Sequence, residues 1–380
     1  MLRNHRQRPS SAKVAATAAV AIVAILLPFA MNAFQLTTAV FVVIAAIGAL
    51  GLGVLTGYAG QISLGHSFFL AIGAYTAAVL GGNDHLTAAI WLPAAGLIAA
   101  LCGALVGPAA LRLRGLYLAI VTIGLVFIGQ HIWFNVGAIS GGPGGRSFPA
   151  VAFGSFNFSV GQQLSLGGLV IDHNGLYYYL ALIILALAML YVWNLSRSRP
   201  GRAMQAVRER EIAASVMGVN LARTKVSAFA ISSFLAGISG ALYASFLSFI
   251  TPDQWSLLLS VQYVAAIIVG GIGTVWGPVL GSIVIFALPP VLQSLVPQTA
   301  SGGVPVDDLT SIAYGVLIII FFVFEPGGVV GLARRLQRVR QGGRQGGRRQ
   351  SGEAIHKREG EEPSQIQEQP MEERVPTWAK

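Results

Sequence analysis

Polar side chains that could bind a solute lie in an otherwise hydrophobic stretch that glycines interrupt. Gly57 and Gly60 come first, and Gln61, Ser63 and His66 follow. Backbone that leaves the helical conformation at membrane depth must face protein or water, because lipid cannot satisfy its N–H and C=O groups. Neutral side chains form hydrogen bonds and still release a solute readily. The pattern predicts a pathway lining, and hydrogen bonds that hold a subunit interface are the competing interpretation.

Residues for catalysis or ion coupling are missing from the apolar parts of the sequence. No Asp, Glu, Lys or Arg lies inside those parts between Val14 and Phe324, and His66 and His131 stand alone. The sequence has no paired carboxylates, no metal-spaced His or Cys cluster, and no GxxxxGK followed by Ser or Thr. We therefore predict that the chain is not an enzyme and holds no cofactor or metal. Proton-coupled carriers usually need buried ionisable groups. A sodium site built from carbonyl and hydroxyl oxygens would escape this test, so an ion-coupled secondary carrier stays an alternative.

A long polar loop, residues 196–225, separates two groups of hydrophobic segments. The loop and its immediate flanks carry Arg197, Arg199, Arg202, Arg208, Arg210, Arg223 and Lys225 against Glu209 and Glu211. Basic loops of this kind stay on the cytoplasmic side of a membrane. Good helix formers, with Pro200 and Gly201 before them and Gly218 after them, predict one amphipathic helix. Such a helix either lies on lipid headgroups or docks on a partner, and its small residues favour docking.

The composition is that of a membrane protein. Of 380 residues, 54% are hydrophobic and only 11% are charged, whereas a soluble domain has about 25% charged residues. The net charge of +10 comes from basic residues that cluster beside hydrophobic segments. This placement explains the charge without a nucleic acid partner. Cys102 is the single cysteine, so no disulfide framework can form.

The hydrophobic segments predict an all-α polytopic fold of about ten transmembrane or re-entrant helices with both termini in the cytoplasm. A basic arm, 1–13, precedes a transmembrane domain, 14–332, and a tail, 333–380, has too few aliphatic residues to fold and should be disordered. Within the domain, 137–175 is an external loop with a small β-hairpin, and 269–282 holds enough glycine to break one helix into two at a cytoplasmic-side bend. The second glycine-rich stretch serves either the pathway or helix packing. The expected segments are 14–31, 38–55, 57–80, 90–111, 116–136, 177–195, 226–250, 261–290 and 309–332.

Four ordered motifs resemble those of a known family. They are GYAGQISLGHSFFLAIGAYTAAVL, RLRGLYLAIVTIG, GRAMQAVREREIAASVMGVNLARTKVSAFAISSFLAGISGALYA and IIVGGIGTVWGPVLG. Together they are similar to the LivM-type permease subunit of bacterial ABC importers for branched-chain amino acids, from about residue 36 to residue 332. The tail beyond residue 343 lies outside this resemblance.

The resemblance implies a heteromeric importer in the bacterial inner membrane. Its expected partners are a LivH-like sister permease, two ATPase subunits that hydrolyse ATP, an external amino-acid-binding protein and membrane lipid, with no nucleic acid. The loop would be the coupling element, which assigns ATPase contact to Arg208, Glu211, Ala213, Ala214 and Gly218. Ile212 intrudes in the EAA…G pattern of importer permeases. A permease for urea, short amides or another small polar solute of the same superfamily is the alternative.

Overall fold

The computed structural model describes most residues between 22 and 295 and four residues beyond them. The described residues are 22–82, 86–113, 115–148, 151–153, 156–157, 164–166 and 169–295, with 312, 315, 316 and 319. The chain divides into two units, Met1–Leu332 and Ala333–Lys380. The predicted arm 1–13, the first part of the segment 14–31, most of the segment 309–332 and the tail 333–380 lie outside the described residues.

Helices make up nearly all of the described chain, and five of those described are long and apolar enough to cross a membrane. These are α2 with the π-helix η1 that continues it (Ala33–Leu52 and Gly53–Tyr58), α4 (Ala88–Val106), α6 (Leu116–Asn135), α8 (His173–Arg197) and α11 (Leu221–Leu247). Shorter apolar helices are α3 (His66–Gly82), α12 (Leu257–Gly270) and α13 (Trp276–Leu295). Further helical segments are residues 22–30, α5 (Ala109–Arg112), α7 (Gly137–Ser140), η2 (Gly142–Gly144), α9 (Arg199–Glu209), α10 (Glu211–Val216) and η3 (Pro252–Trp255). The predicted all-α class is therefore confirmed.

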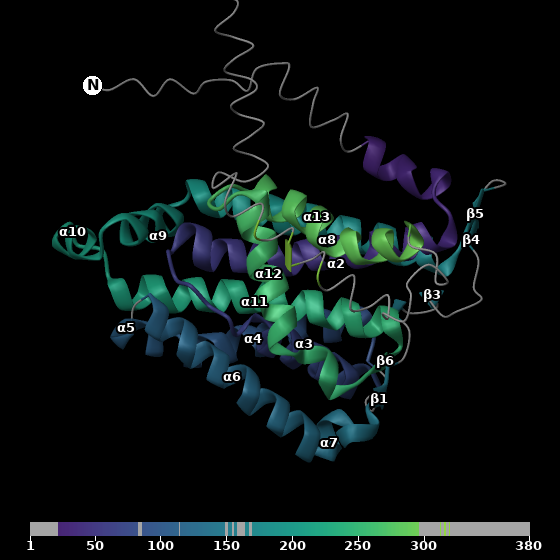
Figure 1. The fold of residues 1–380 in the computed structure, drawn as a ribbon, viewed down its shortest axis with the longest axis horizontal. Helices are drawn as coiled ribbons and strands as arrows, with labels where there is room; N and C mark the ends of the chain where they lie inside the picture. Colours follow the sequence, from purple (N-terminus) through teal and green to yellow (C-terminus); the bar gives the residue numbers. More distant parts are fainter. Residues whose placement is uncertain are drawn as a thin grey trace, which may run out of the picture. The chain divides into compact units, whose positions relative to one another are not determined.

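Helix α11 lies at the centre of the helices and packs on α2, α3 and α4 (Figure 1). Small residues let the backbones approach, as is common between membrane helices. A Cβ atom on Gly73 of α3 would overlap the Gly237 carbonyl of α11, and one on Gly237 would lie 2.6 Å from Cβ of Ala99 in α4. The glycines at these crossings thus serve close packing.

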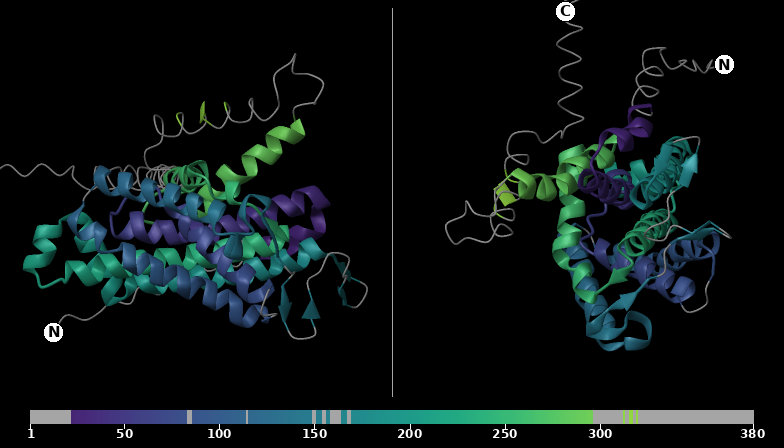
Figure 2. Two further views of the ribbon diagram at one scale, coloured as in Figure 1. Left: turned by 90° about the horizontal axis from the view of Figure 1, so that it is seen from below. Right: turned by 90° about the vertical axis from the view of Figure 1, so that its right-hand side faces the viewer.

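Short strands gather at the end of the helices opposite α9 and α10, as the views in Figures 1 and 2 show. In the loop 137–175, where one small hairpin is predicted, the structure has two. The antiparallel pairs are β2 (Ala152–Phe153) with β3 (Phe156–Asn157), β4 (Leu164–Leu166) with β5 (Leu169–Ile171), and β1 (Arg146–Ser147) with β6 (Phe249–Ile250). The third pair joins the loop to the segment that follows α11, which no local pattern in the sequence indicates.

Candidate functional site

The first glycine break lies between α2 and α3. The helix widens into η1, which ends at Tyr58, and Gly60 then takes a φ of 68°. Residues 61–65 are not helical, and α3 begins at His66. Two bonds close the turn: the Gln61 N–H donates to the Leu55 carbonyl at 3.1 Å, and Thr56 Oγ1 donates to the Gln61 carbonyl at 3.0 Å. The predicted interruption is therefore present, over residues 59–65, with a π-helical turn before it, a feature frequent at functional sites.

Two of the predicted pathway residues are buried with partners inside the chain. His66 Nε2 lies 3.0 Å from the Gly48 carbonyl, and its ring packs on Tyr263 with centroids 4.9 Å apart. Ser63 Oγ accepts a hydrogen bond from the Gly65 N–H at 3.3 Å. In this conformation both side chains are buried and hold the break in place.

Gln61 differs from the other two. Its side chain is only 5% exposed, and neither polar atom of its amide has a hydrogen-bond partner within the described part of the chain. Leaving a buried polar group unsatisfied costs about 1–3 kcal/mol. Of the three polar residues predicted for the pathway, Gln61 is thus the one whose side-chain polar atoms are buried without a hydrogen-bond partner among the described residues.

The second glycine break separates α12 from α13. Gly271 and Gly273 have φ values of 112° and 82°, which L side chains rarely adopt. Thr274 Oγ1 accepts from the Gly277 N–H at 2.9 Å and satisfies a free N–H group at the start of α13. The predicted division of 261–290 into two shorter helices is therefore confirmed.

The two breaks touch. A Cβ atom on Gly57 would lie 2.9 Å from the backbone nitrogen of Gly273 and 3.3 Å from its Cα. One on Gly53, at the start of η1, would lie 2.8 Å from Cγ of Pro278 in α13. Both stretches are marked by glycines in the sequence, but no sequence pattern indicates that they meet.

Arg208 of α9 lies against this junction. Its Nη1 donates a hydrogen bond to the Gly57 carbonyl. A Cβ atom on Gly60 would lie 2.9 Å from Arg208 Cγ, and one on Gly273 would lie 2.9 Å from Arg208 Nη1. The arginine predicted to contact a partner protein therefore contacts both glycine breaks of its own chain.

The loop that carries Arg208 contains two helices, not the single helix predicted. α9 ends at Glu209 and α10 begins at Glu211, while Arg210 between them is extended, with φ −154° and ψ 105°. Glu211 is fixed by an ion pair, because its Oε1 lies 2.6 Å from Nζ of the buried Lys225 in α11. The single-helix prediction is therefore wrong: Arg210 is extended, and the residue after it pairs with a residue of α11, a contact that local helix preference does not take into account. Gly218, with φ 82°, follows α10 as the predicted stop.

The two sides of α10 differ in character. Ala214 is 3% exposed and packs within its own chain, whereas Ala213 is exposed. Ile212, Val216 and Met217 are 73%, 81% and 84% exposed. The small size of Ala214 therefore serves internal packing, and the larger apolar residues form the exposed face. We call Ile212, Val216 and Met217 the apolar face of α10. The sequence signal for it, which none of the predictions above used, is two large apolar residues four positions apart in a polar loop.

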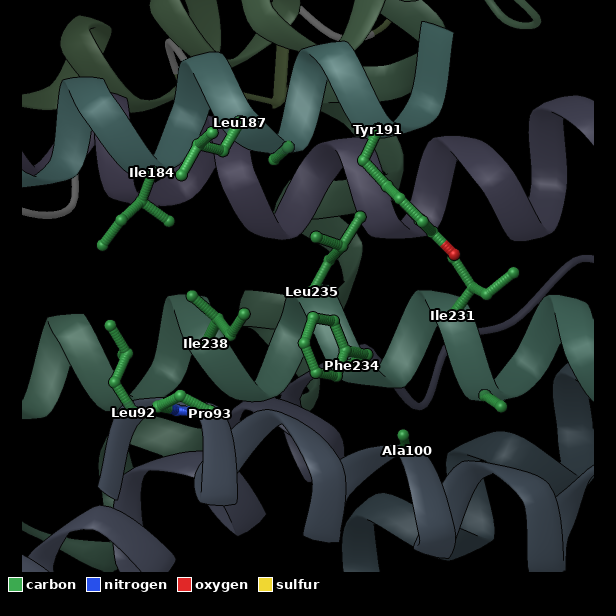
Figure 3. Close-up of a pocket in the computed structure, with 12 residues that line it drawn as sticks. Leu92, Pro93, Ala100, Ile184, Leu187, Tyr191, Ile231, Phe234, Leu235 and Ile238 are labelled. Carbon is green, nitrogen blue, oxygen red and sulfur yellow. The ribbon is translucent and has the colours of Figure 1, made fainter. Parts of the chain in front are cut away.

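An apolar groove lies elsewhere on the helices, between α4, α8 and α11 (Figure 3). Its volume is about 560 Å³, and Tyr191 brings a hydroxyl group to one end. Leu92, Phe234 and Ile238 are among its lining residues, and none of the predicted pathway residues lines it. In the described part of the chain, no three His, Cys, Asp or Glu side chains gather closely enough to hold a metal ion.

Comparisons with known proteins connect this geometry to a family. Residues 34–322 match the family model of the branched-chain amino acid transport system permease component. The high-affinity branched-chain amino acid transport system permease protein LivM of Escherichia coli K12 is 31% identical over 341 residues, which cover 86% of this chain and 77% of that protein. LivM of Salmonella typhimurium LT2 is 31% identical over 337 residues, 85% of this chain and 76% of that protein.

A more distant similarity covers a smaller part. The autoinducer 2 import system permease protein LsrC of Enterobacter sp. strain 638 is 34% identical over 119 residues, which are 30% of this chain and 34% of that protein. No solved structure matches the chain.

Proposed function

This chain belongs to the family of branched-chain amino acid transport system permease components, and from that premise we propose that it forms the translocation pathway of an ABC importer for branched-chain amino acids. The observation that carries the proposal is the similarity to LivM over 86% of the chain. The chain is an integral membrane protein with apolar helices long enough to cross a bilayer. It contributes no catalytic site of its own, and ATP is hydrolysed by separate subunits.

The apolar face of α10 is where we place the contact with the ATPase subunits. Exposed apolar patches on a protein surface mark sites of protein interaction, and this one lies on a short helix at the end of the membrane helices. In this arrangement Glu211 and Ala214 set the position of α10 from inside, while Ala213 and Gly218 flank the contact. The further partners of the complex are a LivH-like sister permease and an external amino-acid-binding protein.

The basic loop also supports an orientation. The α9–α10 end carries the arginines of the loop and belongs in the cytoplasm, so the strands at the opposite end face outside. With about ten membrane segments, both termini would then be cytoplasmic, in the inner membrane of a bacterium.

For the pathway, Gln61 is the residue that we expect to meet the solute. Its amide is buried without a hydrogen-bond partner among the described residues, and the residue follows the turn at Gly57 and Gly60. Ser63 and His66 would keep the break in shape from within. The competing role, a hydrogen bond to the sister permease, would use the same amide.

Reconstitution tests the function directly. The chain, its sister permease, both ATPases and the binding protein are placed in proteoliposomes, and uptake of labelled leucine is followed with ATP. We expect uptake that requires ATP and the binding protein. Uptake of urea in place of leucine would show that the importer carries a different class of solute. Uptake driven by a sodium gradient without ATP would contradict the proposal that the chain is part of an ABC importer.

A further inference from the structure

We propose that Arg208 is a positioning residue that fastens both glycine breaks to α9, so that a movement of the α9–α10 loop reaches the two breaks together. This inference rests on the function proposed above. It assigns Arg208, whose side chain is exposed on one side, to contacts within the permease, where it joins three segments of one chain.

The first contact of Arg208 lies at the end of η1. Carbonyl groups in the last turn of a helix have no partner within that helix. The Gly57 carbonyl belongs to this group and accepts its hydrogen bond from the Arg208 guanidinium. A positive charge at the C-terminal end of a helix is also favoured by the helix dipole. Arg208 therefore caps the end of the helix that leads into the first break.

The second contact of Arg208 lies at the turns themselves. The stem of Arg208 lies over Gly60 and its guanidinium lies over Gly273, each close enough that an added Cβ would come within 2.9 Å of it. Both glycines have positive φ, 68° and 82°, at the points where the chain reverses its course. One side chain thus covers the turning point of both breaks.

Helix α9 is itself held in place. Met204 and Val207 bury the inner face of α9 in the protein, and the ion pair between Glu211 and Lys225 fixes the start of α10 to α11. Because α9 and α10 are anchored at these points, a displacement of α10 moves α9 as well. Arg208 then transmits that displacement to the end of η1 and to the turn between α12 and α13.

Arg202 provides a matched control on the same helix. It has the same charge and is exposed like Arg208, but its Nη1 donates to the Arg197 carbonyl within the loop, at 2.8 Å. Losing Arg202 removes one positive charge from α9 without touching either break.

The test compares three variants in the fully assembled transporter in proteoliposomes. The measured quantity is the amount of labelled leucine imported for each ATP hydrolysed. We expect Arg208→Gln to lower the leucine imported per ATP at least tenfold. Arg208→Lys should give a value between those of Arg208→Gln and the wild type, because an ammonium group keeps the charge but not the planar fork. Arg202→Gln should stay within twofold of the wild type. The ATPases should still copurify with Arg208→Gln.

Hydrogen exchange on the wild-type complex adds a measurement that needs no variant. Adding ATP should change exchange at residues 57–60 and 271–275 together, and in Arg208→Gln the change should remain confined to the loop. Normal uptake per ATP in Arg208→Gln, loss of the ATPases from that variant, or an ATP response in the wild-type loop that leaves both breaks unchanged would each overturn the inference. A wild-type complex without ATP-driven uptake would instead reject the proposed function.

Discussion

The two helices of the loop between α8 and α11 differ in the side chains that they bury and expose. α9 turns Met204 and Val207 into the protein and lays Arg208 on the two glycine breaks. α10 exposes its apolar face and keeps only Ala214 inside. The extended residue Arg210 makes this change of direction possible. One loop thus contacts the interior of its own chain with one helix and exposes an apolar surface with the next.

The largest effect should come from the inner helix. Met204→Ala removes a side chain with no exposed surface, and deletions of this kind cost about 2–5 kcal/mol. Thermal unfolding of the purified chain in detergent should show this loss. Met217→Ala, on the exposed face, should change stability by no more than about 0.5 kcal/mol. Equal losses of stability in the two variants would contradict the difference in burial between α9 and α10.

The ion pair at the join of the two helices should have the next effect. Glu211→Gln removes the carboxylate that lies beside the buried Lys225. Since a hydrogen bond to a charged group contributes about 1.5–3 kcal/mol, and Glu211 is itself partly exposed, we expect a loss of about 1–2 kcal/mol in stability. The exposed neighbour Glu209 is the control, and Glu209→Gln should unfold like the wild type. A stable Glu211→Gln variant would show that the pair does not fix α10.

Substitution on the outer helix should leave folding unchanged and weaken assembly. Val216→Asp places a charge in the centre of the apolar face, and residues at the centre of an interface often contribute more than about 1 kcal/mol to binding. We expect the affinity for the ATPases to fall roughly tenfold, which corresponds to about 1.4 kcal/mol, in a pull-down with graded ATPase concentrations. Val216→Leu should bind normally. Undiminished binding by Val216→Asp would place the contact elsewhere.

The smallest effect is expected at the end of α10. Gly218 has a φ of 82° and open space around it in the described structure, so Gly218→Ala meets backbone strain without a clash. The cost should be about 1 kcal/mol, and Gly218→Asn should lose less because Asn tolerates this conformation better. Thermal unfolding of both variants measures the difference. A loss above that of Glu211→Gln would mean that Gly218 contacts the protein more closely than the structure shows.

Local patterns in the sequence predicted the places where the chain changes direction. Glycine runs placed both breaks, and Pro200 and Gly218 placed the limits of the loop helices. These features depend on residues next to one another, because backbone preference is a local property.

Contacts between distant residues could not be predicted in the same way. Nothing near Arg210 indicates that the helix stops there, and the ion pair that Glu211 forms beside it joins a residue of α11. The meeting of Gly57 with Gly273 likewise joins two stretches that lie far apart in the sequence. For His66, the sequence indicated a buried polar residue but not whether it would face a pathway or a neighbouring helix.

The most direct test of the division between α9 and α10 is thiol labelling in membranes. Cys102 is first replaced by Ala, and single cysteines are introduced as Val216→Cys and Met217→Cys on the outer face and as Met204→Cys on the inner one. We predict that a membrane-impermeant reagent labels the first two from the cytoplasmic side alone, that added ATPases protect them, and that Met204→Cys stays unlabelled. Labelling of Val216→Cys from outside, or unchanged labelling when the ATPases are present, would contradict the account.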